Sequence, residues 1–328
     1  MREEIVIPAW EVASKNTEIK IFNFFPSLLS TVYLSLILLY QVSWTYINVF
    51  SLNDQFFTIV INFVHQSYFT EVIVGFVVFF LAYILITPIS QGGIIALIDA
   101  ECQGKSDSQK TINFGLGRGF KYFLPVFEAN NITALFKLLS ILTFTIFLLR
   151  LFGVAYIAYI FGAMGMYFLL AMLLNIFLAY THFFIVLERM SAFDAIVASS
   201  TMALENLGIT FKLYVTLILV YVRTVLTVLV FILLPFAVSA IFTYITIAGV
   251  KLIFFGLVAL LILAFLIFVS HLNSVLEIFV ETLWYRAYVD NKGKMETDGP
   301  KHGSDHTEKS HGGHDSGHGH ESGHGEHH

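Results

Sequence analysis

Long runs without charged residues alternate with short polar segments over most of the chain. The two longest runs enclose 33 uncharged residues between Lys20 and Asp54 and 37 between Arg150 and Glu188. A helix needs about 20 apolar residues to cross a hydrocarbon core about 30 Å thick, and a charge at its centre is costly. The pattern therefore predicts six membrane-spanning helices. They lie near residues 27–50, 72–98, 133–155, 160–187, 209–236 and 250–276.

The polar segments between the predicted spans have the character of interfacial helices. In 191–206, Ser191 and Asp194 form a capping box, and apolar residues follow at helical spacing. The segment 107–125 carries Gly115, Gly117 and Gly119. Such a glycine run could cradle phosphate, but the functional version follows a β-strand, and no strand is expected here. Close packing at the membrane surface is the favoured interpretation.

The predicted fold is an all-α, polytopic membrane helix bundle with three regions. Residues 1–26 form a cytoplasmic amphipathic segment, residues 27–286 a six-span membrane domain, and residues 287–328 a disordered, His-rich cytoplasmic tail. The first 26 residues lack the features of a removable signal peptide. We expect the first span itself to direct the chain to the membrane.

Composition agrees with a membrane protein and excludes several other classes. The chain is 57% hydrophobic and only 12% charged, against about 25% charged in soluble domains. Its formal net charge of −5 provides no basic surface for nucleic acid. Cys102 is the single cysteine, so no internal disulfide can form. No catalytic triad, cysteine pair or phosphate loop with its lysine can be assembled, and we expect no enzyme activity.

The distribution of lysine and arginine predicts the orientation of the chain. Basic residues precede span one, lie between spans two and three, and follow span six, whereas segments 51–68 and 156–159 contain none. Basic loops remain on the cytoplasmic side. Both termini are therefore predicted to be cytoplasmic, in a prokaryotic inner membrane, with Lys251 as the exception to the bias.

Ionisable residues within the spans are candidate functional groups. Arg223 lies well inside span five, where it either contacts an anionic substrate or forms a structural ion pair with Glu71 at the outer end of span two; we favour the ion pair. His271, Glu277 and Glu281 on span six are expected at the depth of His182 and Glu188 on span four. They could hold a cation or pass protons, but hydrogen-bonded helix packing is the more ordinary explanation.

The C-terminal tail is the most unusual part of the sequence, because nine of its last 27 residues are histidine. Neutral imidazole binds Zn, Ni and Cu, and a flexible glycine-rich chain can wrap around a metal ion. The alternative is a disordered, pH-responsive tail without a metal. The candidate metal ligands are His302, His306, His311, His314, His318, His320, His324, His327 and His328.

Two stretches resemble a known group of membrane proteins. These are residues 89–95 (ISQGGII) and residues 187–196 (LERMSAFDAI), the second followed by Ser199 and Ser200. They look like uncharacterised six-helix integral membrane proteins of prokaryotes. One branch of that group is the membrane domain of glycerophosphoryl diester phosphodiesterases. The resemblance implies a six-helix fold in the inner membrane, but not the activity, because the soluble catalytic domain is absent from this sequence.

Two roles follow from these features. The first is a non-catalytic inner-membrane protein in envelope organisation or membrane homeostasis, or a subunit of a membrane complex, with the lipid bilayer and other membrane proteins as partners. The second is a transition-metal transporter whose tail buffers Zn, Ni or Cu. A transporter should bring polar side chains together within the bilayer, often beside broken helices.

The six-span topology can be tested with reporter fusions. Fusions after residues 60, 158 and 248 should report the outside, and fusions after residues 110, 200 and 300 the cytoplasm, because basic segments stay inside. Alkaline phosphatase and green fluorescent protein activities measure the two sides. A cytoplasmic signal from the fusion at 60 or 158 would contradict the topology.

Overall fold

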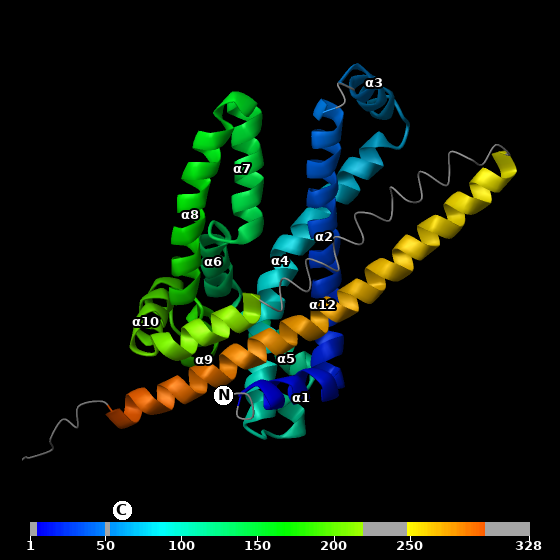
Figure 1. The fold of residues 1–328 in the computed structure, drawn as a ribbon. Coiled ribbons are helices and arrows are strands. Elements are labelled where there is room, and N and C mark those ends of the chain that lie inside the picture. Colours follow the sequence, from blue (N-terminus) through cyan, green and yellow to red (C-terminus); the bar gives the residue numbers. More distant parts are fainter. Residues whose placement is uncertain (1–4, 50–52, 219–247, 299–328) are drawn as a thin grey trace, which may run out of the picture.

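The computed structural model describes residues 5–49, 53–218 and 248–298, and every regular element in these ranges is helical (Figure 1). The prediction of an all-α fold is thus confirmed for the described residues. The helices are α1 (Ile7–Lys15), α2 (Thr17–Val49), α3 (Asn53–Val64), α4 (Phe69–Cys102), α5 (Ile112–Lys121), α6 (Phe123–Ala134), α7 (Leu138–Phe152), α8 (Ile157–Phe177), α9 (Thr181–Glu188), α10 (Ala192–Glu205), a helix Leu207–Ile218 and α12 (Ala248–Asp298).

Two helical hairpins and one long helix make up the architecture. Helices α2 and α4 form one hairpin and α7 and α8 the other, and α12 crosses the molecule obliquely (Figure 1). The short helices α1, α5, α9 and α10 gather at one end. Helix α12 packs most extensively against α2 and α1, so it links the N-terminal segment to the first hairpin.

Four helical stretches are long and apolar enough to cross a membrane. They are Thr17–Trp44, Phe69–Cys102, Ile157–Glu188 and Gly256–Gly293. They overlap the predicted spans 27–50, 72–98, 160–187 and 250–276. The described part of the chain is therefore all-α and contains four candidate membrane spans.

The two remaining predicted spans differ from simple helices or lie largely outside the described residues. Where the sequence predicts one span over 133–155, the structure has α6 and α7, which meet at a bend of 47° and would together form a fifth span. Of the predicted span 209–236, only the part up to Ile218 is described.

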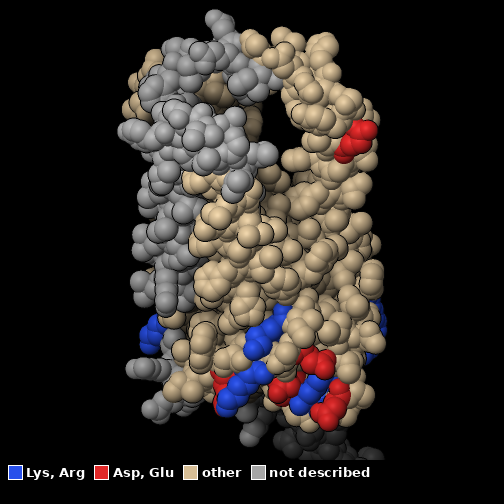
Figure 2. All heavy atoms as spheres, turned by 90° about the vertical axis from the view of Figure 1, so that its right-hand side faces the viewer, with Lys and Arg blue, Asp and Glu red and all other residues tan. Residues whose placement is uncertain are grey.

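Charged residues are concentrated at one end of the molecule. On the face that Figure 2 shows, most of the visible charged side chains lie near that end, below a broad uncharged surface, and one acidic side chain lies near the opposite end. Lys105 pairs with Asp99 at 2.5 Å there, and Lys110 pairs with Glu101 at 3.2 Å. We call this region the charged end. A bilayer would cover the uncharged band and leave the charged end among headgroups and water.

Helices α2 and α12 are joined by a seam of polar contacts. The Asn23 amide donates to the carbonyl of Ser274 at 3.2 Å, and the Ser27 hydroxyl donates to the carbonyl of Ser270 at 3.0 Å. The Asn273 amide donates to the Thr31 hydroxyl at 3.1 Å. Small and polar residues allow close approach of membrane helices and bond across them, which fixes the register of this pair.

The glycines of α5 allow it to pack directly on α4. A Cβ at Gly119 would lie 2.1 Å from the carbonyl oxygen of Ile89, and one at Gly115 would lie 2.8 Å from the Leu97 side chain. A Cβ at Gly117 would meet nothing within 4 Å. Two of the three glycines therefore serve helix packing, which supports the packing interpretation of this run over phosphate binding.

Two helix boundaries bear on the sequence predictions. The N-cap part of the predicted capping box is present: the Ser191 hydroxyl accepts a hydrogen bond from the Asp194 N–H at 3.3 Å, and α10 begins at Ala192. The Asp194 carboxylate accepts from the Ser191 hydroxyl at 2.7 Å. Helix α12 continues through Asp298, beyond the expected end of the membrane domain at residue 286. Ala287 and Tyr288 are buried, so packing extends the helix into the first part of the segment that was predicted to be tail.

The glycine packing gives a matched pair of substitutions. We expect Gly119→Ala to lower the free energy of unfolding by about 1–3 kcal/mol, because the new methyl group overlaps the α4 backbone. Gly117→Ala should be neutral or stabilising by up to about 1 kcal/mol, because alanine favours the helix. Thermal unfolding in detergent measures both. Equal effects of the two substitutions would contradict close packing at Gly119.

Candidate functional site

A cluster of polar side chains lies between the two hairpins, about 12 Å inside the charged end. This depth follows from Gln91, which precedes Asp99 by eight residues of α4 at about 1.5 Å per residue. The members come from α2, α4, α6, α9, α12 and the break between α6 and α7. We call this group the inner polar cluster. It consists of Asn23, Gln91, Asn130, Lys137, His182, Glu277 and Glu281.

Hydrogen bonds connect the neutral members of the cluster to the acidic ones. The Asn23 amide donates to Glu277 Oε2 at 3.0 Å. The Asn130 amide donates to Gln91 Oε1 at 2.8 Å, and Gln91 in turn bonds to Glu281. The two glutamates are thus held by amide side chains from α2 and α4.

His182 extends the network to α9. Its Nε2 lies 3.2 Å from Asn130 Oδ1, at hydrogen-bonding distance, with the proton on His182 Nε2 because the amide oxygen can only accept. Asn130 therefore joins His182 on one side to Gln91 on the other. The four helices α4, α6, α9 and α12 are connected through this chain of polar contacts.

Lys137 supplies the positive charge of the cluster. Its ammonium lies close enough to Glu277 and Glu281 for their charges to attract. The side chains of Lys137 and Glu277 have exposed surface, while Glu281 and His182 are partly buried. The protein itself therefore does not cover Lys137 and Glu277.

The break between helices α6 and α7 explains the position of Lys137. Helix α6 ends at Ala134 and α7 begins at Leu138, with extended backbone at Lys137 (φ −73°, ψ 142°). Helix α8 satisfies the freed carbonyls: Tyr167 donates to Leu135 at 3.0 Å and Asn175 to Phe136 at 2.8 Å. Irregular backbone persists in a membrane only where such partners exist.

Prolines lie one turn from two other members. Pro88 of α4 precedes Gln91 by three residues, and Pro26 of α2 follows Asn23 by three. Proline removes one helical N–H, so the carbonyl four residues earlier loses its usual partner. Pro235, in the predicted span 209–236, lies outside the described residues.

The charges of the cluster define its chemistry. Two carboxylates lie near a single ammonium, and Lys137 attracts both. One positive charge can balance only one carboxylate, so the other must hold a proton or a cation, or be compensated by a bound group. The amides supply both donors and acceptors. The described residues contain no group of three or more His, Cys, Asp or Glu that could hold a metal ion. The arrangement suits a polar solute and a proton.

The ionisable residues that the sequence suggests as functional groups lie in different parts of the structure. His182, Glu277 and Glu281 belong to the cluster, whereas His271 is exposed on α12. Glu188 lies at the charged end, where it pairs with Lys292 and accepts a hydrogen bond from Tyr288 at 2.8 Å.

The predicted ion pair and the tail involve residues outside the described part of the chain. Glu71 is exposed in the first turn of α4, and its expected partner Arg223 lies outside the described residues. The nine histidines from His302 to His328 also lie outside them.

Sequence reasoning missed Asn23, Gln91, Asn130 and Lys137. Lys137 stands at the start of the predicted span 133–155, where it was indistinguishable from a basic residue at the interface. The available signal was the pairing of a polar residue with a nearby proline, as in Gln91 with Pro88. Only the helix arrangement brings these residues to the same place.

Arg150 connects the two hairpins far from the charged end. Its guanidinium donates to the Tyr40 hydroxyl at 2.7 Å and to Gln41 Oε1 at 2.6 Å. It also stacks over the Trp44 ring at 4.0 Å. Stacking and hydrogen bonding together hold α7 against α2 at this end. We call this contact the Arg150 clasp.

No family model, curated protein or solved structure matches this chain.

The coupling within the inner polar cluster can be measured with a double-mutant cycle. We expect Lys137→Gln to destabilise the protein in detergent, because both glutamates lose their cation. Adding Glu277→Gln should recover part of that loss, with a coupling energy of about 0.5–3 kcal/mol. Lys212→Gln, on the exposed face of the helix Leu207–Ile218, is the matched control and should change stability by less than about 0.5 kcal/mol. Strictly additive effects at Lys137 and Glu277 would exclude their interaction.

Proposed function

We propose that this chain is a non-catalytic, six-span protein of the prokaryotic inner membrane that transports a small zwitterionic solute, such as an amino acid, together with protons. Both termini are cytoplasmic in this proposal. The observation that carries it is the inner polar cluster, in which Lys137, Glu277 and Glu281 meet at a break between two membrane helices.

Broken helices with polar side chains are the usual construction of transport sites. Unwound backbone and half-helix ends bind ions and charged groups of the substrate within the membrane. Here α7 begins directly after Lys137, so the positive end of its dipole adds to the ammonium charge. This position favours the carboxylate of a solute. Glu277 and Glu281 favour its amino group.

The unequal number of charges supports proton coupling. Lys137 is the one cation of the cluster and can balance only one of the two glutamates, so the second lacks a compensating charge unless a proton or the amino group of the solute is present. Binding of the solute and loss of a proton are then alternatives at the same carboxylate. Exchange of this kind links solute movement to proton movement.

The Arg150 clasp supports alternating access. Transporters expose their site by rocking one helical unit against another. The clasp closes the two hairpins at the end far from the charges, while the inner polar cluster lies nearer to the charged end. This arrangement corresponds to a state that is closed on the outer side.

A purely structural role in envelope organisation or in a membrane complex is the second candidate. Structural polar contacts are present in the seam between α2 and α12, where Ser27, Ser270 and Ser274 are buried. Lys137 and Glu277 differ from these residues because they keep exposed surface. Exposed charge at this depth favours binding over packing.

Transport of a transition metal is supported by the tail alone. The tail histidines would supply metal ligands in the cytoplasm. Among the described residues, those of the inner polar cluster included, no group of three or more His, Cys, Asp or Glu side chains could hold a metal ion. We therefore propose that a metal ion, when bound, is held by the tail, either as transported cargo or as a regulator. The membrane site serves the solute.

Uptake by proteoliposomes tests the proposal. Purified protein is first heated with a panel of amino acids, polyamines and sugars, and a bound solute should raise the melting temperature. Uptake of that labelled solute, driven by an imposed pH gradient, should fall at least tenfold in Glu281→Gln and Lys137→Gln. The control Glu205→Gln, exposed on α10, should retain full uptake.

The outcomes separate the three roles. Absence of both a thermal shift and uptake for every solute would favour the structural role. Uptake of zinc, nickel or copper that disappears when the chain is truncated at residue 300 would favour the metal alternative. Equal uptake by Glu281→Gln and the parent protein would remove the inner polar cluster from the transport path.

A further inference from the structure

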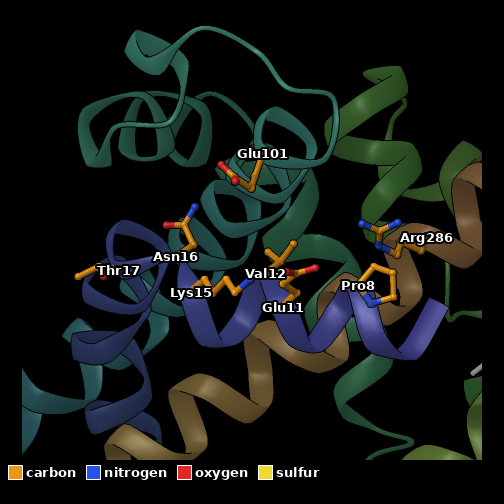
Figure 3. A pocket seen from close by; sticks show the side chains of 8 residues that line it. All are labelled: Pro8, Glu11, Val12, Lys15, Asn16, Thr17, Glu101 and Arg286. Carbon is orange, nitrogen blue, oxygen red and sulfur yellow. Dashed lines mark hydrogen bonds and ion pairs between the residues drawn. The ribbon is translucent and has the colours of Figure 1, made fainter. Parts of the chain in front are cut away.

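A second polar site lies at the charged end, in a pocket of about 500 Å³ (Figure 3). This volume is within the range of about 300–1,000 Å³ that is typical of small-molecule sites. The wall is built from α1, the start of α2, the end of α4 and α12. The lining residues are Pro8, Glu11, Val12, Lys15, Asn16, Thr17, Glu101 and Arg286.

Both acidic residues of the pocket already have a cation. Glu11 pairs with Lys15 one turn later on α1, and Glu101 pairs with Lys110 at 3.2 Å. The hydrogen bond from Lys15 lowers the pKa of the Glu11 carboxyl below its usual value, so Glu11 is ionised at neutral pH. Each pair joins one carboxylate to one ammonium, so the net charge of the two pairs is close to zero.

Arg286 is the positive charge of the pocket that forms no ion pair, although it attracts the Glu11 carboxylate from beyond ion-pairing distance. Among the described residues, no carboxylate oxygen lies within ion-pairing distance of its guanidinium. Its hydrogen bond runs from Nη2 to the sulfur of Cys102 at 4.0 Å, and a thiol is a weak acceptor. Its Nε is buried and has no partner. An arginine in this state costs free energy unless an anion joins it.

The position of Arg286 lets a ligand reach it. Figure 3 shows Arg286 beside Pro8, across the pocket from Lys15, Asn16 and Thr17, with Glu101 on a third side. Arginine binds phosphate through paired N–H groups, which match two phosphate oxygens. The amide of Asn16 and the hydroxyl of Thr17 line the opposite wall and could bond to the rest of a headgroup.

The surroundings of the pocket indicate a ligand at the membrane surface. Helix α1 exposes Trp10 and Ile7, which are 53% and 52% exposed. Tryptophan on a short amphipathic helix typically sits at headgroup level. The pocket opens beside this helix and is larger than a single inorganic ion needs. Glycerol and phosphate of a lipid headgroup would occupy more of it.

We propose that this pocket binds a phosphate group through Arg286, as part of an anionic phospholipid headgroup at the cytoplasmic surface of the membrane. The site is separate from the inner polar cluster and does not depend on transport. Its occupant neutralises Arg286 and ties α1, α4 and α12 together. The bound lipid is thus a structural ligand of the charged end.

Thermal shift measurements on the full-length protein in detergent test the proposal. The probes are short-chain phosphatidylglycerol, short-chain phosphatidylcholine and inorganic phosphate, each at several concentrations. Phosphatidylglycerol should raise the melting temperature of the parent protein with a saturable dose dependence. Arg286→Gln should reduce this shift at least fivefold at a fixed lipid concentration. The control Arg189→Gln removes one exposed arginine at the charged end and should leave the shift unchanged.

Each outcome decides between the sources of the phosphate or overturns the site. An equal shift from inorganic phosphate would show that the free anion is sufficient and would overturn the headgroup. An equal shift in Arg286→Gln and the parent protein, or none from any probe, would overturn the site. If Arg286→Gln does not fold, Arg286→Lys replaces it and should show a weaker shift, because a single ammonium loses the paired contact.

Discussion

The requirement that polar groups inside a bilayer find partners within the protein governs this structure. The seam between α2 and α12 meets it with Asn23, Ser27 and Asn273, which bond across the two helices. The break between α6 and α7 meets it with donors from α8. These bonds fix how the helices are placed against one another, because a shift of either partner would leave a polar group unpaired in hydrocarbon.

The polar groups of the inner polar cluster find partners within the protein only in part, and for this reason we propose the cluster as a binding site. Amides hold Glu277 and Glu281, but the glutamates outnumber the single lysine, and Lys137 remains accessible. A fully satisfied network would rigidify the bundle, as the seam does. A network with one more carboxylate than ammonium can bind a proton or the amino group of a solute. For that reason transport is the stronger proposal than assembly.

Helix α12 connects both proposed sites. Glu277 and Glu281 face the inner polar cluster, and Arg286 reaches the pocket little more than one turn later. Burial of Ala287 and Tyr288 continues the helix beyond the membrane segment and holds Arg286 in place. A headgroup at Arg286 would steady the helix that carries the two glutamates. Binding at the surface and events within the bundle would then share one rigid element.

Features that depend only on neighbouring residues could be predicted from the order of the amino acids. Uninterrupted apolar runs showed where helices long enough to cross a membrane lie, because hydrocarbon excludes charge along each helix separately. Ser191 and Asp194 likewise located the start of α10, since a capping box needs only four consecutive residues.

Features that depend on residues far apart in the chain could not be predicted in this way, because they arise from the packing of the helices. The bend at Lys137 requires Tyr167 and Asn175 from another helix, and no local pattern announces it. The extension of α12 beyond residue 286 depends on burial against other helices, although its local sequence is polar. The cluster joins Asn23 to Glu277, which are more than 250 residues apart. Local sequence specifies where the helices form. The packing of the helices determines which charged side chains lie close together.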